Sequence, residues 1–177
     1  MSFLQIGVMG PSKMNYPSDV MLSKRLERYA EEVGGLLAEQ NAAVLTGGCD
    51  GVMEAAMRGA KSKNGLAIGF PGQKFNQANP YCDIQMLLSF DVASFAYSGM
   101  LSSHALITFP VESAGTMLEI AAAYRHNIPN VLMTGFNPEF EKRHPEYYDA
   151  ARIIPFYWAD NPNEAVLQAI NLGVMRK

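Results

Sequence analysis

Short apolar runs alternate with longer amphipathic stretches along almost the whole chain, and this alternation limits the folds that it can adopt. The runs at 4–9, 42–46 and 104–109 have the length and composition of buried strands. Residues 20–40 instead carry apolar side chains at every third or fourth position, which predicts an amphipathic helix. Strands that alternate with helices form βαβ units with parallel strands. The sequence therefore predicts an α/β fold: a doubly wound, mainly parallel sheet with helices on both faces.

The remaining elements follow the same pattern, and turns rich in Gly, Pro or Asn separate them. Further strands are expected at 66–70, 83–88, 130–133 and 153–157, and further helices at 51–61, 92–102, 115–125, 139–150 and from 161 or 163 onward. A chain of 177 residues with 49% hydrophobic and 18% charged residues has the length and composition of one globular domain. We therefore expect residues 1–177 to form a single domain.

Charge and cysteine content exclude several classes of protein. The net charge is −3 and there is no run of Lys or Arg, so no nucleic-acid partner and no anionic membrane face are expected. No apolar run reaches the length of a membrane span, and the N-terminus lacks the basic region of a signal peptide. The two cysteines, Cys49 and Cys82, show no disulfide or metal-ligand spacing. These features predict a cytoplasmic protein without a metal site.

Three loops at the ends of expected strands are rich in small residues. They are Gly10–Lys13, Thr46–Ala56 and Val111–Thr116, and the last two lead directly into helices. Ligands of doubly wound sheets bind beyond the carboxyl ends of the strands, where small residues let backbone N–H groups approach an anion. We therefore predict a cradle for a phosphate. Its ligand-binding residues would be Gly10, Ser12, Gly47, Gly48, Gly51, Ser113, Ala114, Gly115 and Thr116.

Two acidic residues follow glycines by three or four positions near the starts of helices. Glu119 would hydrogen-bond a ribose or act as an acid or base, while Glu54, with Met53, would support the site or a dimer partner. The alternative is that each carboxylate only stabilises its helix dipole. Cys49 lies before a helix start, where a thiol pKa can be lowered, but it has no visible base partner; a simple loop residue is the other interpretation.

Two familiar nucleotide motifs are absent. None of the three loops has the Lys-Ser/Thr ending of a P-loop, and GPSKMNYPSD after the first strand is not a dinucleotide fingerprint. ATP hydrolysis with a P-loop lysine and nicotinamide or flavin chemistry are therefore not expected. No signature of a pyridoxal phosphate site is present either, so lysine decarboxylation is not expected.

Two segments carry a resemblance to a known family. GGCDGVMEAAMRGAKSKNGLAIGFPG at 47–72 and IGVMGPS at 6–12 resemble Rossmann-fold nucleotide-binding proteins long mislabelled lysine decarboxylases. That group includes the LOG phosphoribohydrolases and the molybdenum-cofactor carrier proteins, and this chain looks closer to the carrier-like branch. The resemblance implies a Rossmann-like, LOG-type sheet, a homodimer, and a nucleoside monophosphate or molybdopterin-type ligand, with no cofactor that is certain.

The chain departs from the LOG enzymes at their catalytic motif, P-G-G-x-G-T-x-x-E. Here Pro110 is followed by VESAGTMLE, so Gly115, Thr116 and Glu119 match the motif. Glu112 and Ser113 then stand where the family has its glycine pair. A carboxylate at Glu112 would repel a phosphate unless its side chain points away.

The second departure is a missing cation. The family enzymes place an Arg on the preceding helix, where this chain has Ala96 and Tyr97. Arg58, Lys13 or Lys74 would have to replace it. Three classes therefore stay open: a binder, carrier or sensor of a phosphorylated ligand, which we favour; a nucleoside 5′-monophosphate phosphoribohydrolase that uses Glu119; and a degenerate structural or regulatory subunit.

Overall fold

Seven parallel strands form one sheet in the computed structural model, which describes residues 3–72, 77–88 and 98–176. The strand order is β4-β3-β2-β1-β5-β6-β7. The strands are β1 (Leu4–Met9), β2 (Ala42–Thr46), β3 (Ala67–Gly72), β4 (Ile84–Leu87), β5 (Ala105–Thr108), β6 (Asn130–Met133) and β7 (Phe156–Ala159). The expected doubly wound fold is confirmed, and every described strand pair is parallel.

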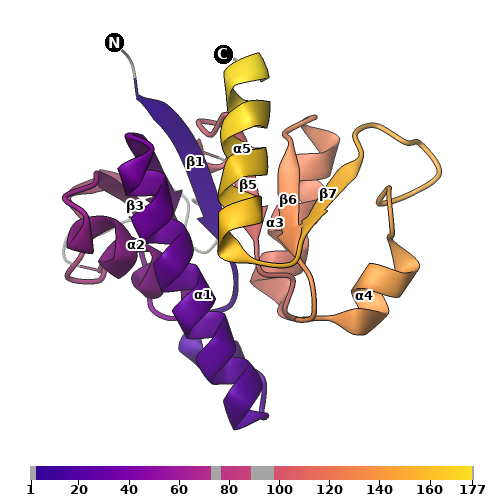
Figure 1. Ribbon diagram of the computed structural model, residues 1–177, viewed down its shortest axis with the longest axis horizontal. Helices are drawn as coiled ribbons and strands as arrows, with labels where there is room; N and C mark the ends of the chain where they lie inside the picture. The colour runs from indigo at the N-terminus through magenta and orange to yellow at the C-terminus, as the bar shows by residue number, and fades with distance from the viewer. Residues whose placement is uncertain (1–2, 73–76, 89–97, 177) are drawn as a thin grey trace.

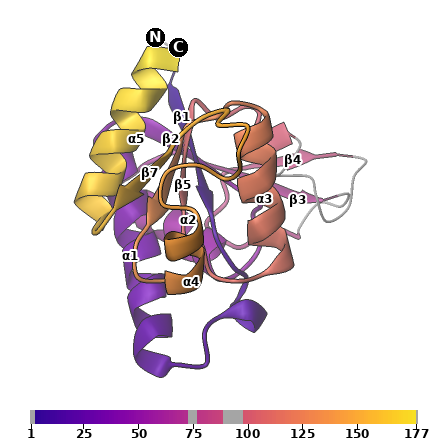
Figure 2. The same ribbon diagram turned by 90° about the vertical axis from the view of Figure 1, so that its right-hand side faces the viewer.

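Helices cover both faces of the sheet (Figures 1 and 2). Figure 2 shows α1 and α5 on one side of the sheet and α3 on the other. The helices are α1 (Val20–Glu39), α2 (Val52–Ser62), α3 (Ala114–Arg125), α4 (Pro138–Arg143) and α5 (Pro162–Arg176), with a short 3-10 turn at Lys13–Asn15. The chain winds outward from β1 to β4, returns to β5 on the other side of β1, and winds outward again. The switch point therefore lies between β1 and β5.

Alternating side chains of the central strands build two cores. Ile6 and Val8 of β1 pack with the apolar faces of α1, α2 and α5, and Met9 belongs to the cluster on the opposite face. In β2, Val44 packs with the first of these clusters and Leu45 with the cluster on the opposite face. Such burial on both faces explains why the strands read as continuous apolar runs.

An asparagine in the left-handed conformation ends three of the helices. Asn41, Asn64 and Asn127 follow α1, α2 and α3 with φ of 54°, 57° and 55°. Asparagine adopts this conformation more readily than most residues, so it can reverse the chain just after a helix. The asparagine after each of these helices therefore helps to turn the chain back toward the next strand.

Two expected elements had the wrong bounds because prolines interrupt them. The helix expected at 139–150 is only α4 and ends before His144, which precedes Pro145 and is therefore disfavoured in a helical conformation. The strand expected at 153–157 begins instead at Phe156, directly after Pro155, which has no N–H for the ladder. Most of the helix expected at 92–102 lies outside the described residues.

Two glycines bring α1 and α2 into backbone contact. A Cβ added at Gly34 would lie 1.8 Å from the Ala56 carbonyl oxygen, and one at Gly59 would lie 1.8 Å from the Glu31 carbonyl oxygen. No side chain fits there. At the neighbouring Gly35, the nearest atom would be 3.5 Å away, an ordinary contact.

This contact predicts opposite results for two adjacent substitutions. Gly34→Ala should lower the free energy of unfolding by about 3 kcal/mol or more, because it forces the helices apart. Gly35→Ala should leave it unchanged or raise it by up to about 1 kcal/mol through helix propensity. Urea denaturation followed by circular dichroism measures both. Equal losses for the two variants would contradict the close approach at Gly34.

Candidate functional site

A cleft of about 420 Å³ opens at the carboxyl ends of β1, β2, β3 and β5, beside the switch point. The structure thus brings the three small-residue loops together. The described residues that line the cleft are Gly10, Pro11, Ser12, Met14, Asn15, Gly47, Cys49, Met53, Phe70, Pro71, Ser113, Gly115, Thr116 and Glu119. Doubly wound folds bind their ligands at this position.

The N-terminus of α3 presents free backbone donors to this cleft. Ser113 caps the helix: its hydroxyl oxygen accepts a hydrogen bond from the Thr116 N–H at 3.2 Å and lies 2.8 Å from the Thr116 hydroxyl. The N–H groups of Ala114 and Gly115 have no acceptor among the described residues. These two donors, together with the positive end of the helix dipole, suit an anion.

Gly115 is not required by the packing of the protein. A Cβ added there would meet no atom within 4 Å, and its φ is not in the left-handed region. A glycine inside a helix is less favourable than alanine by about 1 kcal/mol. The bare backbone at this position therefore leaves room for a group outside the described chain.

At the start of α2, the loop that follows β1 takes up the first backbone donor. The Val52 N–H donates to the Pro11 carbonyl at 3.1 Å, and the Lys13 N–H donates to the Asp50 carboxylate at 3.0 Å. Gly51 has φ of 70°, and a Cβ there would lie 2.5 Å from the Pro11 oxygen. This end of the cleft is held by the chain itself.

Most of the residues predicted to bind the ligand line the cleft, but Gly48, Gly51 and Ala114 do not, and neither does Glu54, which was predicted to support the site. Gly48 packs against Gly69 with φ of 79°, and Gly51 packs against the first loop. Ala114 offers only its backbone, and Glu54 lies 3.8 Å from the Lys13 ammonium. A part in ligand binding stays a prediction for Gly48, Gly51 and Ala114, as does the supporting role of Glu54. Gly48, Gly51 and Glu54 already have contacts within the fold.

Sequence reasoning missed several lining residues. Met14 and Asn15 follow the first Gly-rich loop, and Phe70 and Pro71 end β3. The end of β3 was visible in the sequence as Pro71-Gly72, and its position in the sheet would have placed it at the cleft. At Cys49, burial and then the charges of Asp50 and Glu119 raise the pKa of the thiol, which agrees with a simple loop residue rather than a reactive thiol.

No lysine or arginine is present among the described lining residues. Arg58, one candidate for the missing cation, is held by Glu27 at 3.2 Å and Glu31 at 2.9 Å on α1. Lys13 lies beside Glu54. Lys74 and the positions of Ala96 and Tyr97 lie outside the described residues. The described part of the cleft is therefore a cradle of backbone donors and apolar walls.

The acidic residue that replaces a family glycine does not enter the cleft. Glu112 is exposed and is absent from the described lining. Because the Glu112 side chain does not line the cleft, its carboxylate is not placed to repel a phosphate bound there.

Glu119 lies in the cleft one helical turn beyond Gly115. Its side chain is half-buried, and none of the described residues donates a hydrogen bond to it. Burial disfavours the ionised form and raises the pKa of its carboxyl from 4.5 to about 8. The apolar part of the lining therefore favours the protonated form of Glu119 over the ionised one.

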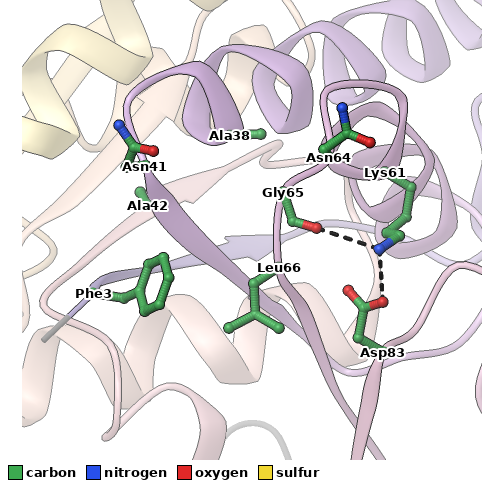
Figure 3. Close-up of a pocket in the computed structure, with 9 residues that line it drawn as sticks. All are labelled: Phe3, Ala38, Asn41, Ala42, Lys61, Asn64, Gly65, Leu66 and Asp83. Carbon is green, nitrogen blue, oxygen red and sulfur yellow. Dashed lines mark hydrogen bonds and ion pairs between the residues drawn. The ribbon is translucent and has the colours of Figure 1, made fainter.

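A second hollow, of about 330 Å³, lies at the opposite end of the sheet (Figure 3). The Lys61 ammonium is 2.7 Å from the Asp83 carboxylate and 3.4 Å from the Gly65 carbonyl oxygen. The Asp83 carboxylate also accepts the Ala67 N–H at 2.9 Å. These contacts join the end of α2 to β3 and β4, so the charged groups of this hollow serve the fold.

Metal binding and membrane insertion find no support in the described residues. Across residues 3–72, 77–88 and 98–176, no group of three His, Cys, Asp or Glu side chains could hold a metal ion. Within the same ranges, no helix is long and apolar enough to cross a membrane.

The fold and the strand-end cleft define a Rossmann-like protein of the LOG and molybdenum-cofactor-carrier type. A model of the SLOG cluster4 family matches residues 3–166, so the chain belongs to that family. The resemblance found in the sequence is confirmed. The chain is also 34% identical over 125 residues to an uncharacterized protein of Archaeoglobus fulgidus, covering 71% of this chain and 76% of that one.

Two solved structures extend the likeness over nearly the whole chain. The molybdenum cofactor binding protein of the phototrophic bacterium Rippkaea orientalis is 26% identical, with a TM-score of 0.80, over 97% of this chain and 98% of that one. The Moco carrier protein of Chlamydomonas reinhardtii is 27% identical, with a TM-score of 0.81, over 98% of this chain and 99% of that one.

The raised pKa of Glu119 predicts how stability varies with pH. Between pH 4.5 and about 8 the unfolded chain loses this proton and the folded chain keeps it, so stability falls as pH rises and levels off above about 8. Glu119→Gln cannot lose the proton. Its Tm relative to wild type should therefore increase steadily from pH 5 to pH 8 in thermal denaturation.

Glu112→Gln provides the matched control, because it removes an exposed carboxylate close to the same helix. Its Tm difference from wild type should show no comparable rise over this range. A constant difference between Glu119→Gln and wild type from pH 5 to pH 8 would contradict the raised pKa of the Glu119 carboxyl.

Proposed function

We propose that this protein binds a small phosphorylated ligand, a nucleotide or a molybdopterin-type molecule, in the strand-end cleft and acts as its carrier. The observation that carries the proposal is the open N-terminus of α3, where Ala114 and Gly115 present free N–H groups and Gly115 leaves empty space. A phosphate fits such a site through hydrogen bonds and the helix dipole. The likeness to proteins that bind or carry the molybdenum cofactor supports a molybdopterin-type ligand.

Hydrolysis of a nucleoside monophosphate is the second candidate. It is favoured by the place of Glu119, a carboxyl group in the cleft whose pKa burial raises. It needs a cation for the charge that develops during bond cleavage, and the described lining offers none. We therefore place binding and transport ahead of catalysis.

We also propose that the protein forms a homodimer. Ile120 and Ala123 of α3 are buried within the chain, but Leu118 on the same helix is 44% exposed. Apolar side chains on the outer side of a helix favour a partner that covers them. Light scattering coupled to size-exclusion chromatography should give twice the mass of the chain, and Leu118→Glu should shift this toward the monomer. A monomeric wild type would contradict the dimer.

Ligand binding can be tested by thermal shift with AMP, GMP, CMP, a molybdenum cofactor preparation and inorganic phosphate. A ligand at 100 times its dissociation constant should stabilise the fold by about 2.7 kcal/mol, or roughly 5–10 °C in Tm for a chain of this size. Gly115→Ala should abolish the shift, because its methyl group fills the proposed phosphate position. Without ligand its stability should be unchanged or slightly higher.

Gly35→Ala makes the same chemical change on α1, away from the cleft, and should retain the full ligand shift. Failure of every ligand to stabilise the wild type would overturn the proposal and favour a structural or regulatory subunit. Release of free base from AMP at high protein concentration, lost in Glu119→Ala, would favour the hydrolase instead.

A further inference from the structure

The N-terminal half of α1 extends beyond the carboxyl ends of the strands, on the same edge of the sheet as the cleft (Figures 1 and 2). Apolar side chains in and just before this part of the helix are exposed to solvent: Met14 is 88% exposed, Val20 64% and Met21 74%. Met14 also lines the strand-end cleft. Exposed apolar groups that gather in one region mark a surface that a partner covers.

Cations share the exposed side of α1 with these apolar groups. Met21, Lys24 and Arg28 follow one another at spacings of three and four residues, so they lie along one stripe of the helix. All three line a hollow of about 610 Å³ on the surface of α1. Methionine and arginine are enriched in protein interfaces, where lysine is depleted but can serve at the polar rim.

The charges of Lys24 and Arg28 are not neutralised within the described part of the chain, where neither forms an ion pair. The acidic groups nearby have other partners. Asp19 caps the start of α1, and Glu27 is 3.2 Å from the Arg58 guanidinium. The stripe is therefore locally basic although the whole chain carries a net charge of −3, and it is complementary to an acidic surface.

The stripe lies away from the proposed dimer contact and next to the cleft. Figure 2 shows α1 and α3 on opposite sides of the sheet, so a homodimer through Leu118 of α3 leaves the stripe uncovered. Met14 belongs both to the cleft lining and to the exposed apolar group that leads into α1. A protein bound to the stripe would therefore stand beside the cleft, where a ligand enters or leaves.

We propose that Met14, Val20, Met21, Lys24 and Arg28 form a docking face for a second protein, one that presents acidic side chains around an apolar contact. In the carrier function proposed above, on which this role rests, that protein delivers the ligand or receives it. The apolar contact supplies affinity, and the charge pairs select the partner and its orientation.

Two cations left unpaired by the described chain suit carboxylates better than a phosphate surface. Recognition of anionic lipid takes clusters of roughly four to eight Lys or Arg. Nucleic acid requires a basic patch that neutralises several phosphates. Arg25 adds little, because its guanidinium donates to the Gly135 carbonyl oxygen. The apolar share of the docking face therefore favours a protein partner over a membrane or a nucleic acid.

The test uses two peptides of equal length and opposite charge. One carries Glu and Leu at helical spacing, and the other has Lys in place of every Glu. Each is added, up to about 1 mM, to ¹⁵N-labelled protein without ligand, and the backbone amide resonances are followed by NMR. The acidic peptide should shift the amides of residues 14–28, and the basic peptide should not bind. No binding of the acidic peptide, or shifts centred elsewhere, would overturn the inference.

Variants of the docking face separate specific docking from general attraction. Lys24→Glu combined with Arg28→Glu should weaken binding of the acidic peptide about tenfold or more, because two attractions become repulsions. Met21→Ser should weaken it several-fold through lost apolar contact. Lys142→Glu reverses an exposed charge on α4 and should bind like the wild type. Circular dichroism verifies the fold of each variant. Equal weakening by Lys142→Glu would contradict a defined face.

Parallel measurements decide against other occupants. Wild type and the Lys24/Arg28 double variant are compared by light scattering, by sedimentation with phosphatidylserine–phosphatidylcholine vesicles, and by anisotropy with a single-stranded DNA oligonucleotide. The two proteins should have the same mass, and neither should bind vesicles or DNA. A lower mass for the double variant would assign the face to self-association, and vesicle or DNA binding lost in that variant would assign it to a membrane or nucleic acid. Either outcome overturns the inference and leaves ligand binding, which the thermal shift measures separately, unaffected.

Discussion

The hydrogen bond from the Val52 N–H to the Pro11 carbonyl fixes the architecture of the strand-end cleft. It joins the loop after β1 to the start of α2, and Gly51 makes the approach sterically feasible. The first backbone donor of α2 is thereby used by the protein's own chain. On the other side of β1, the first two N–H groups of α3 stay free, because the Ser113 cap uses only the Thr116 N–H. The first N–H group of α2 is thus used within the chain, whereas the first N–H groups of α3 are open to a ligand.

Glycine has different physical meanings within a single set of loops. Gly10, Gly48 and Gly51 lie where a side chain would collide with the chain or strain the backbone. Gly115 lies where nothing obstructs a side chain. A glycine that the fold does not require, at a helix start inside a cleft, is better explained by a ligand than by a turn. The likeness to molybdenum-cofactor carriers agrees with this distinction.

The fold could be predicted from the sequence because local signals agree with the final sheet. Strands β1, β2 and β6 have the bounds that their apolar runs indicated, and the small-residue loops marked the correct edge. Prolines at 145 and 155 shifted two later elements, since a missing N–H outweighs apolar patterning. The candidate site could be predicted less completely. The sequence located Glu119 and Gly115, but it could not tell that Gly51 is used internally, that Glu112 points away, or that Phe70 reaches the cleft, because these depend on contacts between distant segments.

The direct backbone contact of α1 with α2 at Gly34 and Gly59 also divides the cleft into a fixed and an adjustable wall. Two helices locked at backbone distance cannot slide, so the β1 and β2 loops keep their shape when side chains elsewhere change. On the α3 side, position 115 tolerates added atoms. A lineage with this fold can therefore exchange one ligand for another through substitutions in the β5–α3 loop, and the stability of the domain would scarcely constrain that change.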